Sequence, residues 1–237
     1  MSIVIIGGGV SGLVAAVNIK HKNPSLNVVL IEKNEKLGGR LYQDKINNYL
    51  INNGPSWYWF NDIINDVFSE IGINNFKTKS LEPQYKLILK DQSIDVPGNF
   101  NELSNLLESY DTNNIDKINR FINKNNKKYN LCKNKYLKFK NLSILEYLSF
   151  DSLKNIFSLD VFKSYRTTIN ELSDNNIVRT LLEWPSLFIG SNPNNISGLF
   201  TILTYFMVTN GTSIPIDNGM IDIVNTLEIK LKTLGVK

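Results

Sequence analysis

Three glycines near the amino terminus are spaced in the way that the phosphates of a nucleotide require. Gly7, Gly9 and Gly12 follow directly on the apolar run IVII, and Glu32 comes 20 residues after the last of them. The first glycine permits a sharp turn, the second lets a pyrophosphate approach the backbone, and the third lets a helix pack closely on a strand. N–H groups at the start of that helix attract anions, and a carboxylate accepts hydrogen bonds from ribose hydroxyls. The spacing predicts a dinucleotide site in which Glu32 disfavours a 2′-phosphorylated cofactor.

The elements around these glycines have the order that such a site needs. Residues 2–6 are apolar and β-branched, which predicts a short buried parallel strand. An apolar helix is expected over 13–20, and a second strand is expected over 26–31 after the turn Asn23-Pro24-Ser25. The chain therefore begins with a βαβ unit of the α/β, Rossmann-like class, in which helices cover a parallel sheet.

A second group of glycines follows the βαβ unit. The run KNEKLGGR comes immediately after Glu32 and ends at Arg40. Plain NAD dehydrogenases do not require Gly-Gly-Arg at this place, whereas the flavoprotein oxidoreductases that share the βαβ unit typically carry it. The two glycines would allow close approach to a cofactor, and Arg40 would lie beside its phosphates.

With these residues in place, the sequence resembles the N-terminal half of the phytoene desaturases. These are FAD-dependent carotenoid desaturases of the bacterial and fungal type, within the amine-oxidase-like flavoprotein superfamily. The resemblance rests on IVIIGGGVSGLVAAVNI, VVLIEKNEKLGGRL and NNGPSWYW, and on a later run over 189–236. It extends along the whole chain and is clearest at 2–60 and 184–236.

The resemblance implies an FAD enzyme that removes hydrogen from a long hydrophobic polyene, a carotenoid precursor, and forms C=C bonds. We expect no metal site, and no side chain here is an obvious general base, so the catalytic residues remain unassigned. The residues expected to bind the cofactor are Gly7, Gly9, Ser11 and Gly12 at the pyrophosphate, Glu32 at the ribose, and Lys33, Gly39, Arg40, Gly54, Pro55 and Ser56 around them.

The sequence departs from the family pattern at two positions and in its length. Asn52 stands where family members usually carry an acidic residue, and Asn218-Gly219 replaces the usual Gly-Gly before Met220. Family members are about twice as long. We therefore expect the C-terminal half of the family fold to be absent from this sequence, which makes it a fragment. A second polypeptide carrying that half is an expected partner.

Composition narrows the class of protein. An apolar content of 42% supports a packed core, and a net charge of only +4 does not indicate a nucleic-acid partner. A single cysteine and a single histidine argue against internal disulfides, multi-histidine metal sites and a histidine-dependent triad. The histidine, His21, is expected at the end of the first helix, where a cation is favourable. Because no apolar run reaches the length of a membrane span, we expect a cytoplasmic protein.

Lysines are concentrated over 117–140, and two interpretations remain open. One is attraction to an anionic membrane surface, where a polyene substrate would be dissolved, so that the protein would be peripheral at a membrane. The other, which we favour, is a solvated helix face and loop.

The rest of the chain is expected to form an inserted, mostly helical α+β substrate-binding domain over 77–208. It would separate the first part of the FAD-binding domain, 1–76, from an incomplete return to it, 209–237. The apolar stretch 181–208 is expected to form either a substrate tunnel or ordinary core. The predicted elements are a hairpin at 42–44 and 49–51, strands at 85–89, 93–96 and 212–215, and helices at 61–71, 100–109, 113–126, 143–157, 160–170, 174–183 and 219–234.

Two other functions compete with the desaturase interpretation. An amine-oxidase-type flavoenzyme would share the glycine motifs and the architecture. A truncated, non-catalytic fragment that binds FAD or a partner chain would also keep them. An incomplete sheet would leave an unpaired edge and exposed apolar surface, so we expect the isolated chain to be poorly soluble.

Overall fold

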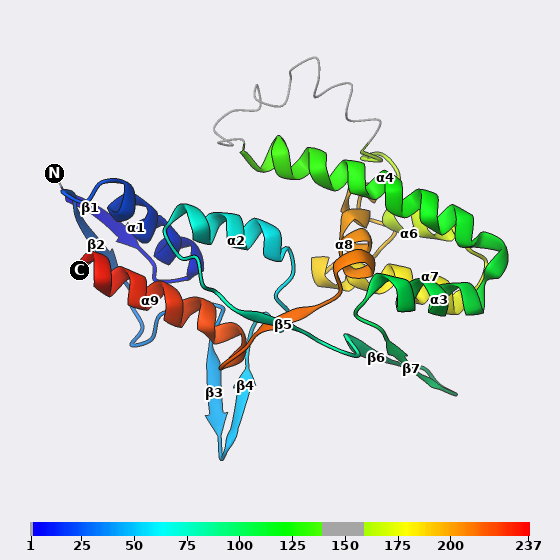
Figure 1. Ribbon diagram of the computed structural model, residues 1–237, viewed down its shortest axis with the longest axis horizontal. Coiled ribbons are helices and arrows are strands. Elements are labelled where there is room, and N and C mark those ends of the chain that lie inside the picture. Colours follow the sequence, from blue (N-terminus) through cyan, green and yellow to red (C-terminus); the bar gives the residue numbers. More distant parts are fainter. Residues whose placement is uncertain (1, 139–158) are drawn as a thin grey trace. The chain divides into compact units, whose positions relative to one another are not determined.

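A computed structural model describes residues 2–138 and 159–237 (Figure 1). The chain forms two compact units: unit 1 comprises residues 1–81 and 212–237, and unit 2 comprises residues 82–211. These divisions lie a few residues after the expected ones at 76/77 and 208/209. The first boundary shifts because β5 (Thr78–Ser80) pairs antiparallel with β8 (Ser213–Pro215) of unit 1. The second shifts because the last helix of unit 2, α8 (Ile202–Asn210), continues to Asn210.

Unit 1 begins with the predicted βαβ arrangement. Strand β1 (Ser2–Ile6) pairs in parallel with β2 (Asn27–Ile31), and helix α1 (Val10–Lys22) connects them. The helix starts before the predicted residue 13 because Gly9 is its N-cap and the rest of the glycine motif forms its first turn. His21 lies in its last turn, as expected. The α/β, Rossmann-like fold class with a mostly helical insert is confirmed.

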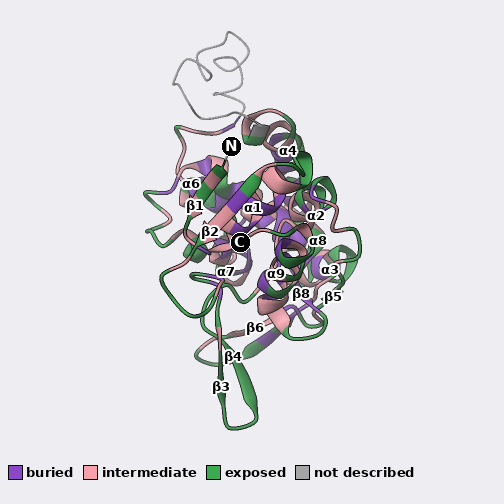
Figure 2. Ribbon diagram, turned by 90° about the vertical axis from the view of Figure 1, so that its left-hand side faces the viewer, coloured by how far each residue is buried: buried purple, intermediate pink, exposed green. Residues whose placement is uncertain are grey.

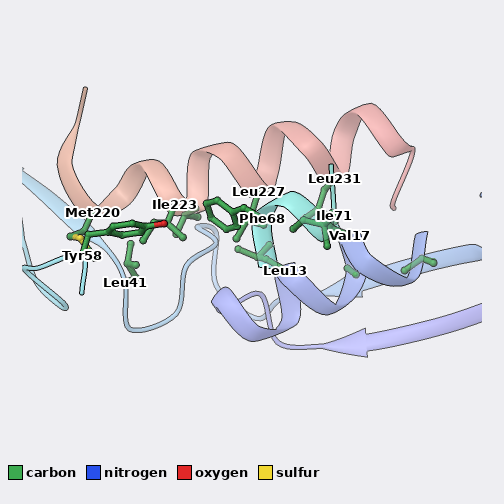
Figure 3. Packing of buried hydrophobic residues seen from close by; sticks show 13 residues of the cluster. Leu13, Val17, Leu41, Tyr58, Phe68, Ile71, Met220, Ile223, Leu227 and Leu231 are labelled. Atoms are coloured by element: carbon green, nitrogen blue, oxygen red, sulfur yellow. The ribbon is translucent and has the colours of Figure 1, made fainter. Parts of the chain in front are cut away.

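Helix α9 (Asp222–Leu234) returns from the far end of the sequence and packs against α1. Figure 3 shows Leu227 and Leu231 pointing toward α1 and toward Phe68 of α2 (Asn61–Glu70). A short 3-10 turn, η6 (Gly219–Ile221), begins this segment. The last residue continues beside the sheet, where Leu30 N donates to the Lys237 carbonyl at 2.7 Å. The core of unit 1 is therefore built from segments at opposite ends of the chain.

Two further predictions in unit 1 had different outcomes. Strands β3 (Gln43–Ile46) and β4 (Tyr49–Asn52) form the expected antiparallel hairpin, and most of it is exposed (Figure 2). In α2, the helical spacing of the apolar residues Ile63, Ile64, Val67, Phe68 and Ile71 predicts that they share one buried face, but the side chain of Val67 is 37% exposed. The buried face of that helix is therefore narrower than the spacing of its apolar residues predicts.

Unit 2 combines one hairpin with several helices, as expected. Strands β6 (Tyr85–Ile88) and β7 (Ser93–Val96) pair antiparallel. The helices are α3 (Phe100–Tyr110), α4 (Ile115–Asn134), α6 (Tyr165–Asn170), α7 (Asn176–Glu183) and α8 (Ile202–Asn210), with 3-10 turns η1 (Thr112–Asn114), η2 (Tyr136–Lys138), η4 (Trp184–Ile189) and η5 (Gly198–Thr201). Within the described ranges, no helix is both long and apolar enough to cross a membrane.

Some helix boundaries in unit 2 differ from those predicted. Helix α4 continues to Asn134, well beyond the predicted end at 126. Helix α6 starts at Tyr165 rather than 160, because Ser164 caps it by accepting a hydrogen bond from Thr167 N. The helix predicted over 143–157 lies outside the described residues.

The apolar stretch 181–208 is partly core and partly surface. Phe206, Met207 and Val208 of α8 are fully buried, which is what ordinary core requires. Leu187 and Phe188 of η4, by contrast, are 67% and 46% exposed. The core interpretation therefore holds for these residues of α8, and the substrate tunnel stays a prediction.

Candidate dinucleotide-binding site

The loop between β1 and α1 is held in a shape that only glycine permits. Gly7 has φ of +104°, and its N–H donates to the Ile31 carbonyl at 2.7 Å. A Cβ on Gly12 would lie 2.0 Å from the Gly7 carbonyl oxygen. The sequence predicted that Gly12 allows the helix to pack closely on the strand. The Cβ would, however, lie 3.6 Å from the Ile5 side chain of that strand, so the backbone of the loop restricts this position more tightly than the strand does. Both glycines shape the loop through its backbone.

The N-terminus of α1 has the features of an anion site. Gly9 is the N-cap, and its carbonyl accepts the first intrahelical bond, from Leu13 N at 2.9 Å. Among the described residues, no side chain caps this terminus, and the first turn contains no acidic residue. The N–H groups of Val10, Ser11 and Gly12 precede that first bond, so they are available to a ligand. With the helix dipole, they favour a phosphate.

The Gly-Gly pair packs backbone to backbone against this loop. Gly38 N donates to the Gly8 carbonyl at 2.8 Å. Gly39 approaches so closely that its Cβ would lie 3.1 Å from Gly9 Cα. Gly38 and Gly39 both have positive φ, of +115° and +61°. The sequence predicted that both glycines of the pair would allow close approach to a cofactor and named Gly39 among the binding residues. It did not predict the contact between Gly38 and Gly8, although the uninterrupted runs Gly7-Gly8-Gly9 and Gly38-Gly39 were a visible signal for close backbone contact.

The segment Gly54-Pro55-Ser56 joins the site through a third glycine contact. A Cβ on Gly54 would lie 2.1 Å from the Arg40 carbonyl oxygen. Pro55 then follows at the wall of the site. Three stretches that are separate in the sequence are thus brought together where side chains would keep them apart.

These stretches enclose an open hollow of about 570 Å³, a size in the range of ligand sites. It brings together five of the predicted residues: Gly9, Ser11, Gly39, Arg40 and Pro55. Val10, Gly38 and Leu41 complete its lining. Gly7, Gly12 and Gly54 do not line it and act through the backbone shape. Lys33 and Ser56 are exposed and lie outside the lining.

Glu32 connects the second strand to the glycine loop. Its Oε2 accepts a hydrogen bond from Gly8 N at 2.6 Å, and its Oε1 accepts from Asn34 N at 3.0 Å and Nδ2 at 2.8 Å. The bonds from the Asn34 and Gly8 backbones hold the pKa of this carboxyl below its ordinary value. The carboxylate therefore stays ionised and fixes the loop, a role that the sequence did not predict. Oε1 already accepts two hydrogen bonds, so Oε2 is the oxygen to which a ribose hydroxyl could still donate.

The two departures from the family pattern lie side by side in the structure. A Cβ on Gly219 would lie 3.4 Å from Asn52 Nδ2. Gln43 Nε2 donates both to Asn52 Oδ1 at 3.2 Å and to the Asn218 carbonyl at 2.9 Å. A neutral amide network therefore occupies the place where the family usually carries a carboxylate and a second glycine.

The aromatic run after Pro55 divides between core and site surroundings. Tyr58 is fully buried, and its hydroxyl donates to Asn65 Oδ1 at 3.0 Å. Burial raises the pKa of this phenol. Trp57 and Trp59 stack with ring centroids 6.2 Å apart, and Trp59 Nε1 donates to Thr212 Oγ1 at 2.9 Å. These bonds fasten the chain that follows Gly54 and Pro55.

Comparisons with known proteins find a domain match at the amino terminus and relatives along the whole chain. Residues 5–71 match the profile of the NAD(P)-binding Rossmann-like domain. The chain is 28% identical to a 4,4′-diapophytoene desaturase of Staphylococcus aureus, over 100% of this chain and 47% of that protein. It is 23% identical to a carotenoid 3,4-desaturase of Haloarcula japonica, over 99% of this chain and 48% of that protein. The chain thus spans about half the length of these relatives.

Solved structures show the same fold. A triple mutant of putrescine oxidase superposes with a TM-score of 0.57 at 18% identity, covering 99% of this chain and 49% of that one. Cyclohexylamine oxidase from Brevibacterium oxydans gives a TM-score of 0.54 at 15% identity, covering 99% and 49%. At this level of identity the likeness concerns the fold alone.

Proposed function

We propose that this chain provides the cofactor-binding and substrate-binding parts of an FAD-dependent oxidoreductase of the carotenoid desaturase kind. The observation that carries the proposal is the glycine-lined hollow at the uncapped start of α1, with Glu32 fixed beside it. The similarity to carotenoid desaturases along the whole chain supports the choice of chemistry.

The residues present fit the adenine dinucleotide part of FAD. The N–H groups at Ser11 and its neighbours would bind the pyrophosphate, with the Arg40 guanidinium as its counter-charge. Glu32 would accept hydrogen bonds from the ribose hydroxyls. FAD supplies the hydride-accepting chemistry when bound, and the protein contributes binding, orientation and exclusion of water.

An apolar surface in unit 2 supports a hydrophobic substrate. Tyr85 and Trp184 have ring centroids 4.2 Å apart, and Trp184 and Phe188 meet edge to face at 4.9 Å. Leu187, which precedes Phe188 in the same turn η4, has a side chain that is 67% exposed. Exposed large apolar groups next to packed aromatics are expected where a long hydrocarbon binds.

We also propose that the β1–β2 sheet is completed by polypeptide equivalent to the second half of the relatives, in the same chain or in another. Val4, Ile6 and Ile31 are 54%, 86% and 51% exposed, although strands of a parallel sheet are normally covered on both faces. Co-expression of this chain with the second half of a relative tests the idea, since the two should purify together.

The cofactor and the reaction are tested separately. Flavin fluorescence titration of the purified chain should show saturable quenching, which Arg40→Ala weakens. The completed protein, incubated with phytoene or a diapophytoene, should then yield products with additional conjugated double bonds. If hydrogen peroxide is released from amines and no desaturation occurs, the enzyme belongs with the amine oxidases instead. A chain that binds no flavin refutes the proposal as a whole.

A further inference from the structure

A cluster of cations in unit 2 has no part in the dinucleotide site. A hollow of about 200 Å³ lies between α4 and the segment 160–172, which includes α6. Its charged lining consists of the cations Lys117, Arg120, Lys124 and Lys163 and the carboxylates Asp160 and Glu171. The first three cations are spaced i, i+3 and i+7, so they project from one face of α4.

The carboxylates at this hollow are already neutralised by lysines. Asp160 Oδ2 lies 2.7 Å from Lys124 Nζ and 2.5 Å from Lys128 Nζ. Glu171 Oε2 lies 2.5 Å from Lys163 Nζ. In contrast, Lys117 and Arg120 form no ion pair with any residue in the described part of the chain. The hollow therefore keeps an excess of positive charge.

Lys128 pairs with Asp160 from the buried side of the hollow. Its side chain is only 3% exposed, and its Nζ also lies 3.4 Å from the Gly198 carbonyl and from Thr201 Oγ1. Because the Lys128 side chain does not reach solvent, its ammonium group forms its ion pair with Asp160 inside the unit. Burial raises the pKa of the Asp160 carboxyl, but the bonds from Lys124 and Lys128 lower it more. Asp160 thus stays ionised and committed to these lysines. The expectation that the lysines of this region lie on a solvated face is wrong for Lys128.

The floor of the hollow is apolar. Phe121 and Leu172 are both buried and both line it. Charged hydrogen bonds made beside such a surface are less weakened by water than bonds on an open helix face. Lys127, on the same helix, is exposed and does not line the hollow, so it represents an ordinary solvated lysine.

We propose that this hollow binds a phosphate group of a ligand. Arg120 would supply the paired N–H donors that match phosphate oxygens, and Lys117 would add a point charge. Lys124 and Lys163 would contribute the free N–H bonds of ammonium groups already held in place by their carboxylates. The phosphate could come from a lipid headgroup or from a free phosphate ester, since both present the same oxygens.

The test uses the full chain, saturated with FAD so that the dinucleotide site does not take up the probe. Inorganic phosphate is titrated by calorimetry into wild type, Arg120→Gln, Lys117→Gln and the matched control Lys127→Gln. We expect Arg120→Gln to lower the affinity for phosphate at least about tenfold and Lys127→Gln to leave that affinity nearly unchanged. Arg40→Gln reports separately on phosphate at the dinucleotide site, so failure of the FAD proposal remains distinguishable.

Sedimentation with phosphatidylcholine vesicles, with and without phosphatidylglycerol, identifies the source. Binding to the anionic vesicles that is lost in Arg120→Gln indicates a lipid headgroup, whereas binding of free phosphate alone indicates a soluble ester. Circular dichroism spectra show whether Arg120→Gln and Lys117→Gln fold like wild type. If one of them does not, the proposal is tested on the phosphate affinity of the other. Equal weakening by Lys127→Gln, or no binding of either probe, overturns the proposal.

Discussion

Two alanine substitutions in one loop separate the shape of the dinucleotide site from its ligand contacts. At Gly9, φ is −70° and ψ is 170°, which alanine adopts readily, and a Cβ would meet nothing closer than Gly39 Cα at 4.0 Å. That Cβ would lie at the lining of the hollow. At Gly12, the Cβ would lie 2.0 Å from the Gly7 carbonyl oxygen, so the backbone itself would have to move.

The expected magnitudes differ accordingly. Gly12→Ala overpacks the loop and should lower the free energy of unfolding by about 2 kcal/mol. For a chain of this size, that loss lowers the melting temperature by roughly 4–8 °C. Gly9→Ala should melt within about 2 °C of wild type. Its methyl group would displace the pyrophosphate from one or two backbone N–H groups, which weakens FAD about ten- to a hundredfold.

The assay is thermal unfolding without ligand, followed by flavin fluorescence titration of the same samples. Gly9→Ala should lose affinity without losing stability, and Gly12→Ala should lose both. Wild-type FAD affinity in Gly9→Ala would show that the hollow does not hold the pyrophosphate. A wild-type melting temperature in Gly12→Ala would refute the steric account of that glycine.

Three other substitutions test separate parts of the structure. Glu32→Gln should weaken FAD about fivefold, because neutral hydrogen bonds are weaker than charged ones. The Glu32 carboxyl has a lowered pKa in the folded chain. The affinity of wild type for FAD should therefore be full above pH 4.5, the ordinary pKa, and should fall as the pH drops through the lowered pKa. Fluorescence titrations of Glu32→Gln should lack this pH dependence. Lys128→Met leaves Asp160 without its buried partner and should lower the free energy of unfolding in urea by about 3 kcal/mol, whereas the exposed control Lys127→Met should change it by less than about 0.5 kcal/mol. Ile6→Lys, at a side chain that is 86% exposed, should leave that free energy within about 0.5 kcal/mol of wild type and reduce light scattering by aggregates; a large loss of stability would mean that Ile6 is covered in the isolated chain.

Much of the local structure follows from the sequence. The sequence predicted the apolar strand before Gly7, the helix after it and the hairpin of β3 and β4. These elements depend on the spacing of apolar residues and on turn residues, both of which act over a few positions. Boundaries were less certain where a cap decides them, as Gly9 does for α1 and Ser164 does for α6. The glycine spacing also sufficed to predict a dinucleotide site.

Other properties depend on which segments the fold brings together. Gly54 must be glycine because the Arg40 carbonyl lies against it, and Glu32 fixes the loop because Gly8 N points at its carboxylate. Lys128 reads as one more surface lysine, yet the fold buries it against Asp160, 32 residues away. These contacts join residues that are far apart in the sequence, so the local spacing of residue types does not predict them. They depend on how the segments pack together. The sequence determined what kind of site this chain could build, and the tertiary structure decided which side chains line it and which only hold it in shape.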